Sequence, residues 1–394
     1  MKPAPQVPST LAARTVEVDA PADVLDHYVP GGFVFLDRGT AVVARGAAAV
    51  VAPAEVSTVL GGIAHDAPAD APAPLAIGSL PFSGAGTLTI PARTLRIDAR
   101  GRAWQTDVGD ATLEPVVVPD DDAARFVVQA HTTNAEWQLQ VNDALDAIAR
   151  GDVTKLVLAR EVIIEADAPF AIHRILARLR ASQGGCFVFG IDGFVGASPE
   201  LLVRRTGALV ESSPMAGTAA RGGTQADDDA AVDALRHSEK NAREHRVVID
   251  AVRAALAPHC RDLVVPDHPD VVRLATLSHL VTNVRGSLTS SATALDLACA
   301  LHPTPAVNGT PTEAARSLIA QIEQFDRGPY AGPTGWVDAT GDGTFVVALR
   351  CAQIHGAQAQ LFAGAGIVAG SDPDSEWAET QTKLEPMLRA LVRP

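Results

Sequence analysis

The spacing of hydrophobic residues changes character near residue 134. Before that point, apolar residues come in short runs separated by turn residues, namely GGFVFLD, TAVVARG, GTLTIPA and ATLEPVVVP. Short runs rich in valine, phenylalanine and threonine between glycine and proline predict β-strands. The segment AVVAPAEVSTVLGGI fits either a strand with a turn or a weak helix, and both interpretations stay open.

Longer elements are predicted from residue 134 onwards. We expect a helix over 134–150, with Asn134 as its N-cap and Gly151 at its end. The run KLVLAREVIIEA at 155–166 predicts a strand, and a helix is expected near 170–182. The next two runs, GGCFVFGIDGFVGAS and ELLVRRTGALVESSP, are typical of hairpins.

The C-terminal half alternates helices with strands in blocks. Helical segments are expected over 229–257 and 291–301, and GTFVVALRCAQIHGAQAQLFAGAGIV predicts two strands before a last helix. Strands in adjacent hairpins and helices in separate blocks favour an α+β fold with antiparallel sheets over a doubly wound one.

Composition narrows the class of protein. The chain has 394 residues, of which 47% are hydrophobic and 20% charged, as in globular proteins. No apolar run reaches the length of a membrane span, and the N-terminal stretch lacks the apolar core of a secretory signal. The four cysteines are scattered without CxxC spacing, which is typical of free thiols in a reducing compartment. We therefore expect a cytoplasmic protein.

The net charge of −14 disfavours nucleic acid or an anionic membrane as partner. It would also repel a small anionic substrate, so such a substrate would require a local cationic or metal site.

Two glutamates that are far apart in the sequence fall on apolar helical faces. Glu244 shares a stripe with Val248 and Val252, and Glu376 lies in SDPDSEWAETQTKLEPMLRAL. A carboxylate buried on such a face is costly unless it is paired or binds a metal. Mg²⁺ commonly takes one or two carboxylates together with waters and a ligand oxygen. A magnesium site and two ordinary solvated helix faces both remain open.

Other polar residues lie in strand-like or tightly turned contexts. Lys155 begins a predicted strand. It fits either a buried lysine whose pKa is lowered by desolvation, which can act as a base, or an ordinary lysine with its ammonium in water. Glu200 fits a desolvated general acid or a surface carboxylate, and Arg350 fits a carboxylate clamp or a salt bridge. Gly364–Gly366 leave backbone N–H groups open to an anion or allow close strand packing. His279 fits a core histidine as well as a ligand contact.

Several strings occur in the order typical of one known family: TKLVLAR, GASPELLVRR, SSPMAGTAARG, EKNAREHRVVID, LHPTPAVNGTP, FDRGPYAGPTGWVD, TFVVALRCAQI, FAGAGIVAGSDPDSEWAET and TKLEPML. Together they resemble the chorismate-utilising enzymes, which include anthranilate synthase component I, and within them the isochorismate synthases. The likeness covers 134–394, whereas 1–133 matches weakly. It implies one domain over 1–394, in which two antiparallel sheets pack together with helices outside.

The resemblance also implies roles for individual residues. Lys155 is similar to the base that activates water, and Glu200 to the acid that protonates the leaving hydroxyl. Metal ligands for Mg²⁺ are implied at Glu244, Glu376 and Glu379, although Asn241 replaces a carboxylate found in some relatives. Contacts with chorismate are implied at Gly217, Thr218, His279, Ala306, Tyr330, Arg350, Gly364, Ala365, Gly366 and Lys383.

Two positions bear on the expected product. Lys155 is missing from relatives that aminate chorismate, and salicylate-forming relatives tend to have threonine where this chain has Ala306. The resemblance therefore implies an isomerase that stops at isochorismate, in siderophore or menaquinone biosynthesis. Salicylate synthase is the alternative enzyme, and a chorismate-binding protein without activity is the third hypothesis. We expect a monomer.

Overall fold

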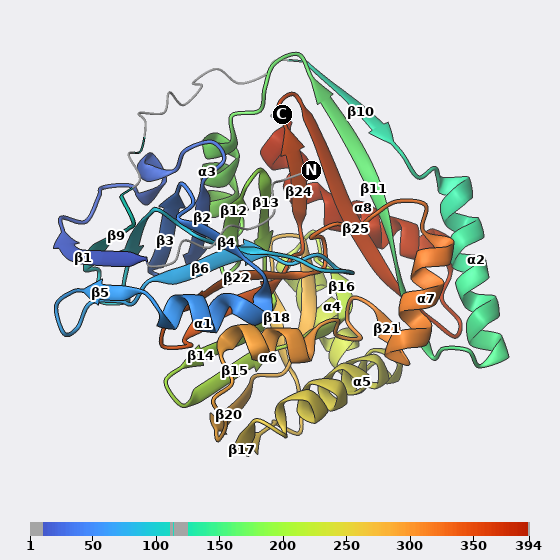
Figure 1. Ribbon diagram of the computed structural model, residues 1–394. Helices are drawn as coiled ribbons and strands as arrows, with labels where there is room; N and C mark the ends of the chain where they lie inside the picture. The colour runs from blue at the N-terminus through green and yellow to red at the C-terminus, as the bar shows by residue number, and fades with distance from the viewer. Residues whose placement is uncertain (1–10, 111–112, 114–124, 393–394) are drawn as a thin grey trace.

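The computed structural model describes residues 11–110, 113 and 125–392. Within them, most strands belong to two large sheets, and the mostly antiparallel α+β fold predicted from the sequence is confirmed (Figure 1). A third, small sheet accompanies them. No helix in the described ranges combines the length and the apolar composition needed to cross a membrane.

The first large sheet has 13 strands among the described residues. In spatial order these are β10 (Phe126–Ala130), β11 (Lys155–Ala166), β25 (Gln358–Val368), β24 (Cys351–His355), β13 (Phe194–Ser198), β12 (Phe187–Ile191), β2 (Phe33–Asp37), β3 (Thr40–Arg45), β8 (Arg93–Ile97), β9 (Ala103–Val108), β1 (Ala12–Val18) and β5 (Ala64–Asp66), with β21 (Gly309–Thr310) beside β11. β1 and β5 are parallel, and the other pairs are antiparallel.

The second large sheet has nine described strands, in the order β17 (Cys260–Val264), β20 (Val284–Leu288), β15 (Leu209–Ser213), β14 (Leu201–Thr206), β23 (Gly343–Val347), β22 (Pro333–Asp338), β6 (Leu75–Ser79), β7 (Leu88–Ile90) and β4 (Ala49–Val51). The small sheet consists of β16 (Met215–Ala220), β19 (Leu277–Val281) and β18 (Asp270–Arg273).

The helices of the described residues are α1 (Val56–Gly61), α2 (Asn134–Arg150), α3 (Ile172–Ser182), α4 (Gln225–His237), α5 (Glu239–Leu256), α6 (Ala294–Leu301), α7 (Thr312–Ile322) and α8 (Pro373–Leu391). Short 3-10 turns occupy Val24–His27 and Pro53–Glu55.

Buried apolar side chains form two clusters between the sheets and helices. The larger one joins residues of both large sheets, such as Phe189 of the first and Ile77 of the second. The smaller one, which includes Leu361 and Met387, lies where α3 and α8 pack on the first sheet. Because α6 contacts β14, β22 and β23 of the second sheet, the described elements form helix, sheet, sheet and helix layers.

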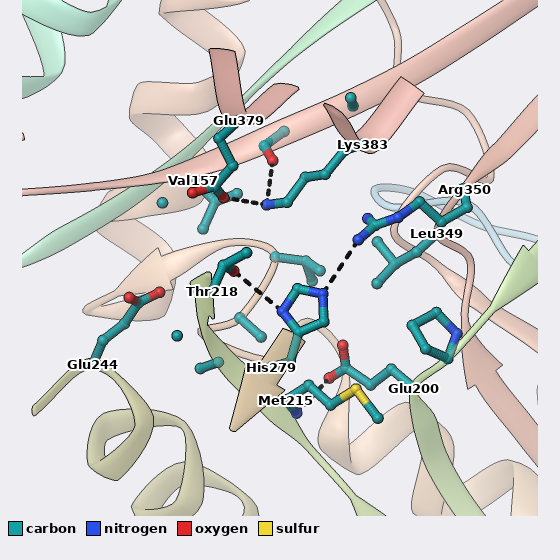
Figure 2. Close-up of a pocket in the computed structure, with 18 of the residues that line it drawn as sticks. Val157, Glu200, Met215, Thr218, Glu244, His279, Leu349, Arg350, Glu379 and Lys383 are labelled. Atoms are coloured by element: carbon teal, nitrogen blue, oxygen red, sulfur yellow. Dashed lines mark hydrogen bonds and ion pairs between the residues drawn. The ribbon is translucent and has the colours of Figure 1, made fainter. Parts of the chain in front are cut away.

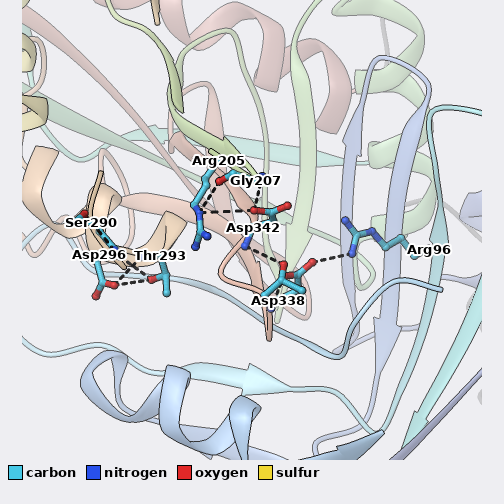
Figure 3. Close-up of polar contacts among 10 residues, drawn as sticks. Arg96, Arg205, Gly207, Ser290, Thr293, Asp296, Asp338 and Asp342 are labelled. Atoms are coloured by element: carbon cyan, nitrogen blue, oxygen red, sulfur yellow. Dashed lines mark hydrogen bonds and ion pairs between the residues drawn. The ribbon is translucent and has the colours of Figure 1, made fainter. Parts of the chain in front are cut away.

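Strands from the N-terminal third enter both large sheets. β2 pairs with β12 in the first sheet, and β6 pairs with β22 in the second. An ion pair of 3.3 Å joins Arg96 of β8 to Asp338 of β22 (Figure 3). The Arg96 guanidinium also lies 4.3 Å from the Trp336 ring centroid. These contacts tie residues before 134 to the part of the chain with the strongest family likeness.

The structure corrects several expected element boundaries. The helix at 134–150 is capped by Thr133, whose side chain accepts from the Glu136 N–H, rather than by Asn134. The segment 229–257 is two helices that meet at Ser238, and its side chain caps the second one. The undecided run AVVAPAEVSTVLGGI contains both a strand, β4, and a helix, α1. Most of ATLEPVVVP lies outside the described residues.

Two further expectations about elements were incomplete. The run 343–368 was predicted as two strands but forms three, because the chain turns between β23 and β24 and passes from one large sheet to the other. Helix α7 was not predicted at all.

Candidate active site

A cavity of about 220 Å³ lies where β16, β19, β25, α5 and α8 meet. Most of the residues predicted from the sequence line it: Glu200, Gly217, Thr218, Glu244, His279, Ala306, Tyr330, Arg350, Gly364, Gly366, Glu376, Glu379 and Lys383. Two predicted residues, Lys155 and Ala365, do not. The predicted groups therefore converge on one place, although they come from segments that range from Glu200 to Lys383.

Lys155 lies just behind the cavity wall. It is buried at the start of β11, and its Nζ donates a hydrogen bond of 2.8 Å to Oε1 of Glu244 on α5. A Cβ at Gly366 would lie 3.0 Å from Lys155 Cε and 3.2 Å from Glu244 Oε1. An added side chain at 366 would therefore crowd this pair, and glycine leaves room for Lys155 beside Glu244, which lines the cavity.

Ala365 is turned away from the cavity. Successive residues of a strand point to opposite faces, so Gly364 and Gly366 face the cavity while the Ala365 side chain is buried in the larger apolar cluster. Gly364 is also closely packed, since an added Cβ would lie 2.8 Å from the Leu158 carbonyl oxygen and 3.0 Å from the Tyr330 hydroxyl.

Arg350 lies in the short connection between β23 and β24 and has a φ of 48°. This left-handed conformation is unfavourable for a residue with a side chain and is found most often at functional sites. Its Nη2 lies 3.3 Å from Nε2 of His279. The turn thus directs a buried guanidinium into the cavity, where burial lowers the pKa of Arg350 (Figure 2).

His279 connects Arg350 to Thr218, whose Oγ1 lies 3.1 Å from His279 Nδ1. Because a guanidinium only donates, Nε2 must be the acceptor, and the network assigns the ring proton to Nδ1. Burial, reinforced by the charges of Arg350 and Lys383, holds the pKa of His279 well below its usual range. His279 is therefore a neutral group that orients its neighbours.

Glu200 follows β13 and is 3% exposed. Burial raises its pKa to about 7, although a backbone hydrogen bond from Met215 and the charges of Lys155 and Arg350 oppose the shift. In Figure 2, Glu200 and Glu244 lie on opposite sides of the His279 ring. A carboxyl group that keeps its proton near neutral pH suits a general acid.

The two glutamates of α8 that line the cavity, Glu376 and Glu379, have unlike environments. Burial raises the pKa of Glu376, whose closest cation is Lys240 at 4.0 Å. Burial opposes ionisation of Glu379 as well, but the nearby cations, Lys383 foremost, together outweigh it and the pKa of Glu379 is lowered. The Lys383 Nζ lies 2.5 Å from Glu379 Oε1 and 2.9 Å from the Gly364 carbonyl oxygen.

The carboxylates of the cavity fit a magnesium ion that is only partly coordinated by protein. Within the described part of the chain, no three His, Cys, Asp or Glu side chains are placed to hold a metal together. Mg²⁺ needs only one or two carboxylates, because waters and a ligand oxygen complete its shell. Glu376 is buried with a raised pKa, so a cation would stabilise its charged form.

Some residues of the cavity were missed from the sequence. Lys240 lines it one helical turn before Glu244, and that spacing of four residues could have predicted it. Val157, Met215 and Phe362 also line the cavity. Their apolar side chains carry no signal that separates a cavity wall from ordinary core.

Comparison with known proteins gives the family. A sequence profile described as chorismate binding enzyme matches residues 102–392. The isochorismate synthase DhbC of Bacillus subtilis is 35% identical, over 93% of this chain and 95% of that protein. The isochorismate synthase EntC of Escherichia coli is 41% identical, over 66% of this chain and 68% of that protein.

A solved structure agrees with these relatives. The menaquinone-specific isochorismate synthase MenF of Escherichia coli superposes with a TM-score of 0.82 at 26% identity, covering 98% of this chain and 96% of that one. The profile match, the relatives and the shared fold all lead to one conclusion, and the chain belongs to the chorismate-binding enzyme family.

Proposed function

We propose that this chain is an isochorismate synthase, an isomerase that converts chorismate to isochorismate. The relatives named isochorismate synthase match most of its length at 35–41% identity. The observation that carries the proposal is chemical: a buried carboxyl group with a pKa of about 7 and a buried lysine adjoin the same cavity. Such a pair can serve as acid and base.

The reaction requires one proton to be removed and one to be added. Water adds at C2 of chorismate, the C4 hydroxyl leaves as water, and the ring double bonds shift. We assign proton removal from the attacking water to Lys155 and protonation of the leaving hydroxyl to Glu200. Each group of this kind contributes ~10²–10⁴-fold in rate. To act on the water, Lys155 Nζ must part from Glu244 Oε1, to which it donates in the structure.

The remaining polar groups would bind and orient the substrate. Chorismate carries two carboxylates, and Arg350 supplies a guanidinium suited to one of them. Glu244 and Glu376 would hold Mg²⁺, and Glu379 would contact it through water. When bound, the ion would neutralise and orient the ring carboxylate. His279 keeps the Arg350 guanidinium in place by accepting its hydrogen bond.

The test is an incubation of the protein with chorismate, with products separated by chromatography. We expect isochorismate to appear with Mg²⁺, to disappear in excess chelator and to return when Mg²⁺ is restored. Glu244→Gln and Glu376→Gln should each weaken the binding of Mg²⁺, so that Mg²⁺ restores turnover less well, without unfolding the chain. Full turnover in excess chelator would refute the metal assignment, and no turnover under any metal condition would refute the isomerase.

A further inference from the structure

One edge of β11 is incomplete beside the cavity. β25 pairs with β11 over almost its full length on one side. On the other side, β21 pairs with residues 155–156 and β10 with residues 162–166. Between them, among the described residues, the stretch 157–161 has no strand partner on that edge. Buried backbone groups without a partner are costly, so other groups must satisfy this stretch.

A buried ion pair and a loop supply those groups. The Ala159 N–H donates to Glu323 Oε1 at 2.7 Å, and Arg327 Nη2 donates to the Val157 carbonyl at 2.8 Å. The Val157 N–H donates to the Asn308 carbonyl at 2.9 Å. Glu323 and Arg327 bind each other through two hydrogen bonds of 2.8 and 2.6 Å. Their side chains therefore take the place of a missing strand.

The same arginine also holds the segment that lies beside β11. Its Nη1 donates to the carbonyl of Val307, next to Ala306, at 2.9 Å. One guanidinium thus binds carbonyls of both Val157 and Val307, and both residues line the cavity. Burial lowers the pKa of Arg327, but the charge and the hydrogen bonds of Glu323 outweigh it, so the pKa of Arg327 is raised and the guanidinium keeps its charge.

The Glu323–Arg327 pair is charged although both side chains are buried. Glu323 and Arg327 are 7% and 3% exposed, and the Arg327 guanidinium lies 4.3 Å from the Phe82 ring centroid. Apolar residues of similar volume often stabilise a core equally well or better. What an apolar pair lacks is directional hydrogen bonds to three separate backbone groups.

We propose that the Glu323–Arg327 pair is a positioning element that fixes the strand carrying Lys155 relative to the loop carrying Ala306. The inference rests on the proposed function, in which Lys155 is the base and Ala306 lines the ring site. Glu323 and Arg327 are not among the residues that line the cavity, and they act through the two neighbouring segments they hold.

The first test separates positioning from stability. Arg327→Lys keeps the charge but loses the fork that serves both carbonyls. We expect kcat to fall ~10²-fold, the effect of about 1 Å of misplacement, and KM or the pyruvate-to-isochorismate ratio to change as well. The control is Arg204→Lys, in an ion pair with Asp37 away from the cavity lining, which should leave KM and the product ratio unchanged. A lower kcat with wild-type KM and product ratio would reduce the pair to a structural role and overturn the proposal.

The second test does not depend on activity. Glu323→Gln keeps an acceptor for the Ala159 N–H, whereas Glu323→Ala removes it. We expect amide hydrogen exchange at 157–159 to rise in the alanine variant far more than in the glutamine variant. Wild-type exchange in Glu323→Ala would overturn the proposal, and if that variant does not fold, Arg327→Lys provides the same readout. Raised exchange in a protein that never acts on chorismate would instead refute the proposed function alone.

Discussion

Glu200 has an environment that couples activity to stability. In the unfolded chain its pKa has the ordinary value near 4.5, and burial raises it to about 7 in the folded protein. As an acid it must be protonated to act, so turnover should fall as pH rises through about 7. The same burial destabilises the folded state once the group ionises.

Glu200→Gln should therefore move activity and stability in opposite directions. We expect turnover to fall ~10²-fold or more, and Lys155→Gln to lose a similar factor, while both variants still bind chorismate. Steady-state kinetics and binding measured by calorimetry check this. A near-wild-type rate in either variant would remove that residue from the mechanism.

The stability change has a defined pH window. Below about pH 4.5 the carboxyl is protonated in both states, and between 4.5 and about 7 only the unfolded chain releases its proton. Wild-type stability relative to Glu200→Gln should thus decline across this window by about 3 kcal/mol, since one pKa unit corresponds to about 1.4 kcal/mol. Denaturant unfolding from about pH 5 to about pH 8 measures it. A difference between the two proteins that does not vary with pH would contradict the assigned pKa.

At the scale of elements, sequence patterns predicted correctly those helices and strands whose ends are set by neighbouring residues. The strand 155–166 was predicted with its observed bounds, because its alternating and apolar residues lie between clear turn signals. The hairpins β12–β13 and β14–β15 and the C-terminal helix were predicted correctly for the same reason. The helix at 134–150 ends at Gly151, which adopts the left-handed conformation that glycine favours.

Elements that depend on tertiary contacts were missed. Apolar residues flank Arg350 on both sides, and the sequence there contains no glycine, proline or other turn residue. No local signal therefore marks the turn at which the chain passes from one sheet to the other. The break at Ser238 lies within a continuous helical pattern, and a single serine cap decides it. The partners of β11 at 157–161 come from Glu323 and Arg327, which no periodicity connects to that strand.

At the scale of the whole molecule, the site is an assembly of distant segments. The spacing of Glu244 and Glu376 left inward carboxylates and solvated helix faces both open, and in the structure both side chains line the cavity. That they meet Arg350 and Glu200 there came from the family resemblance, because sequence patterns carry no information on which segments pack together. Neither source predicted that Lys155 would be bonded to Glu244 or that the Ala365 side chain would face the core.

We also propose that the chain is one cooperative folding unit. β2 and β6 complete the two large sheets, so a fragment of residues 134–394 would leave β12 and β22 with exposed edges. We expect that fragment to aggregate or to lack a cooperative thermal transition, whereas the full chain unfolds in one step. Calorimetry checks both. A soluble fragment with a sharp transition near that of the full chain would show a separate domain.

The central claim is that this cavity isomerises chorismate and stops at isochorismate. Ala306 lines the cavity with a methyl group, at a position where the family resemblance implies a hydroxyl in salicylate-forming relatives. Ala306→Thr should raise pyruvate release modestly, because one added polar group rarely converts a site completely.

The most direct measurement is the product stoichiometry of the wild-type protein with chorismate and Mg²⁺ near neutral pH. Isochorismate is quantified by chromatography and pyruvate by a coupled lactate dehydrogenase assay, with isochorismate alone as the control for spontaneous decay. The account predicts isochorismate with little pyruvate beyond that control. Salicylate and pyruvate formed in equal amounts from the chorismate consumed would contradict it and identify a salicylate synthase.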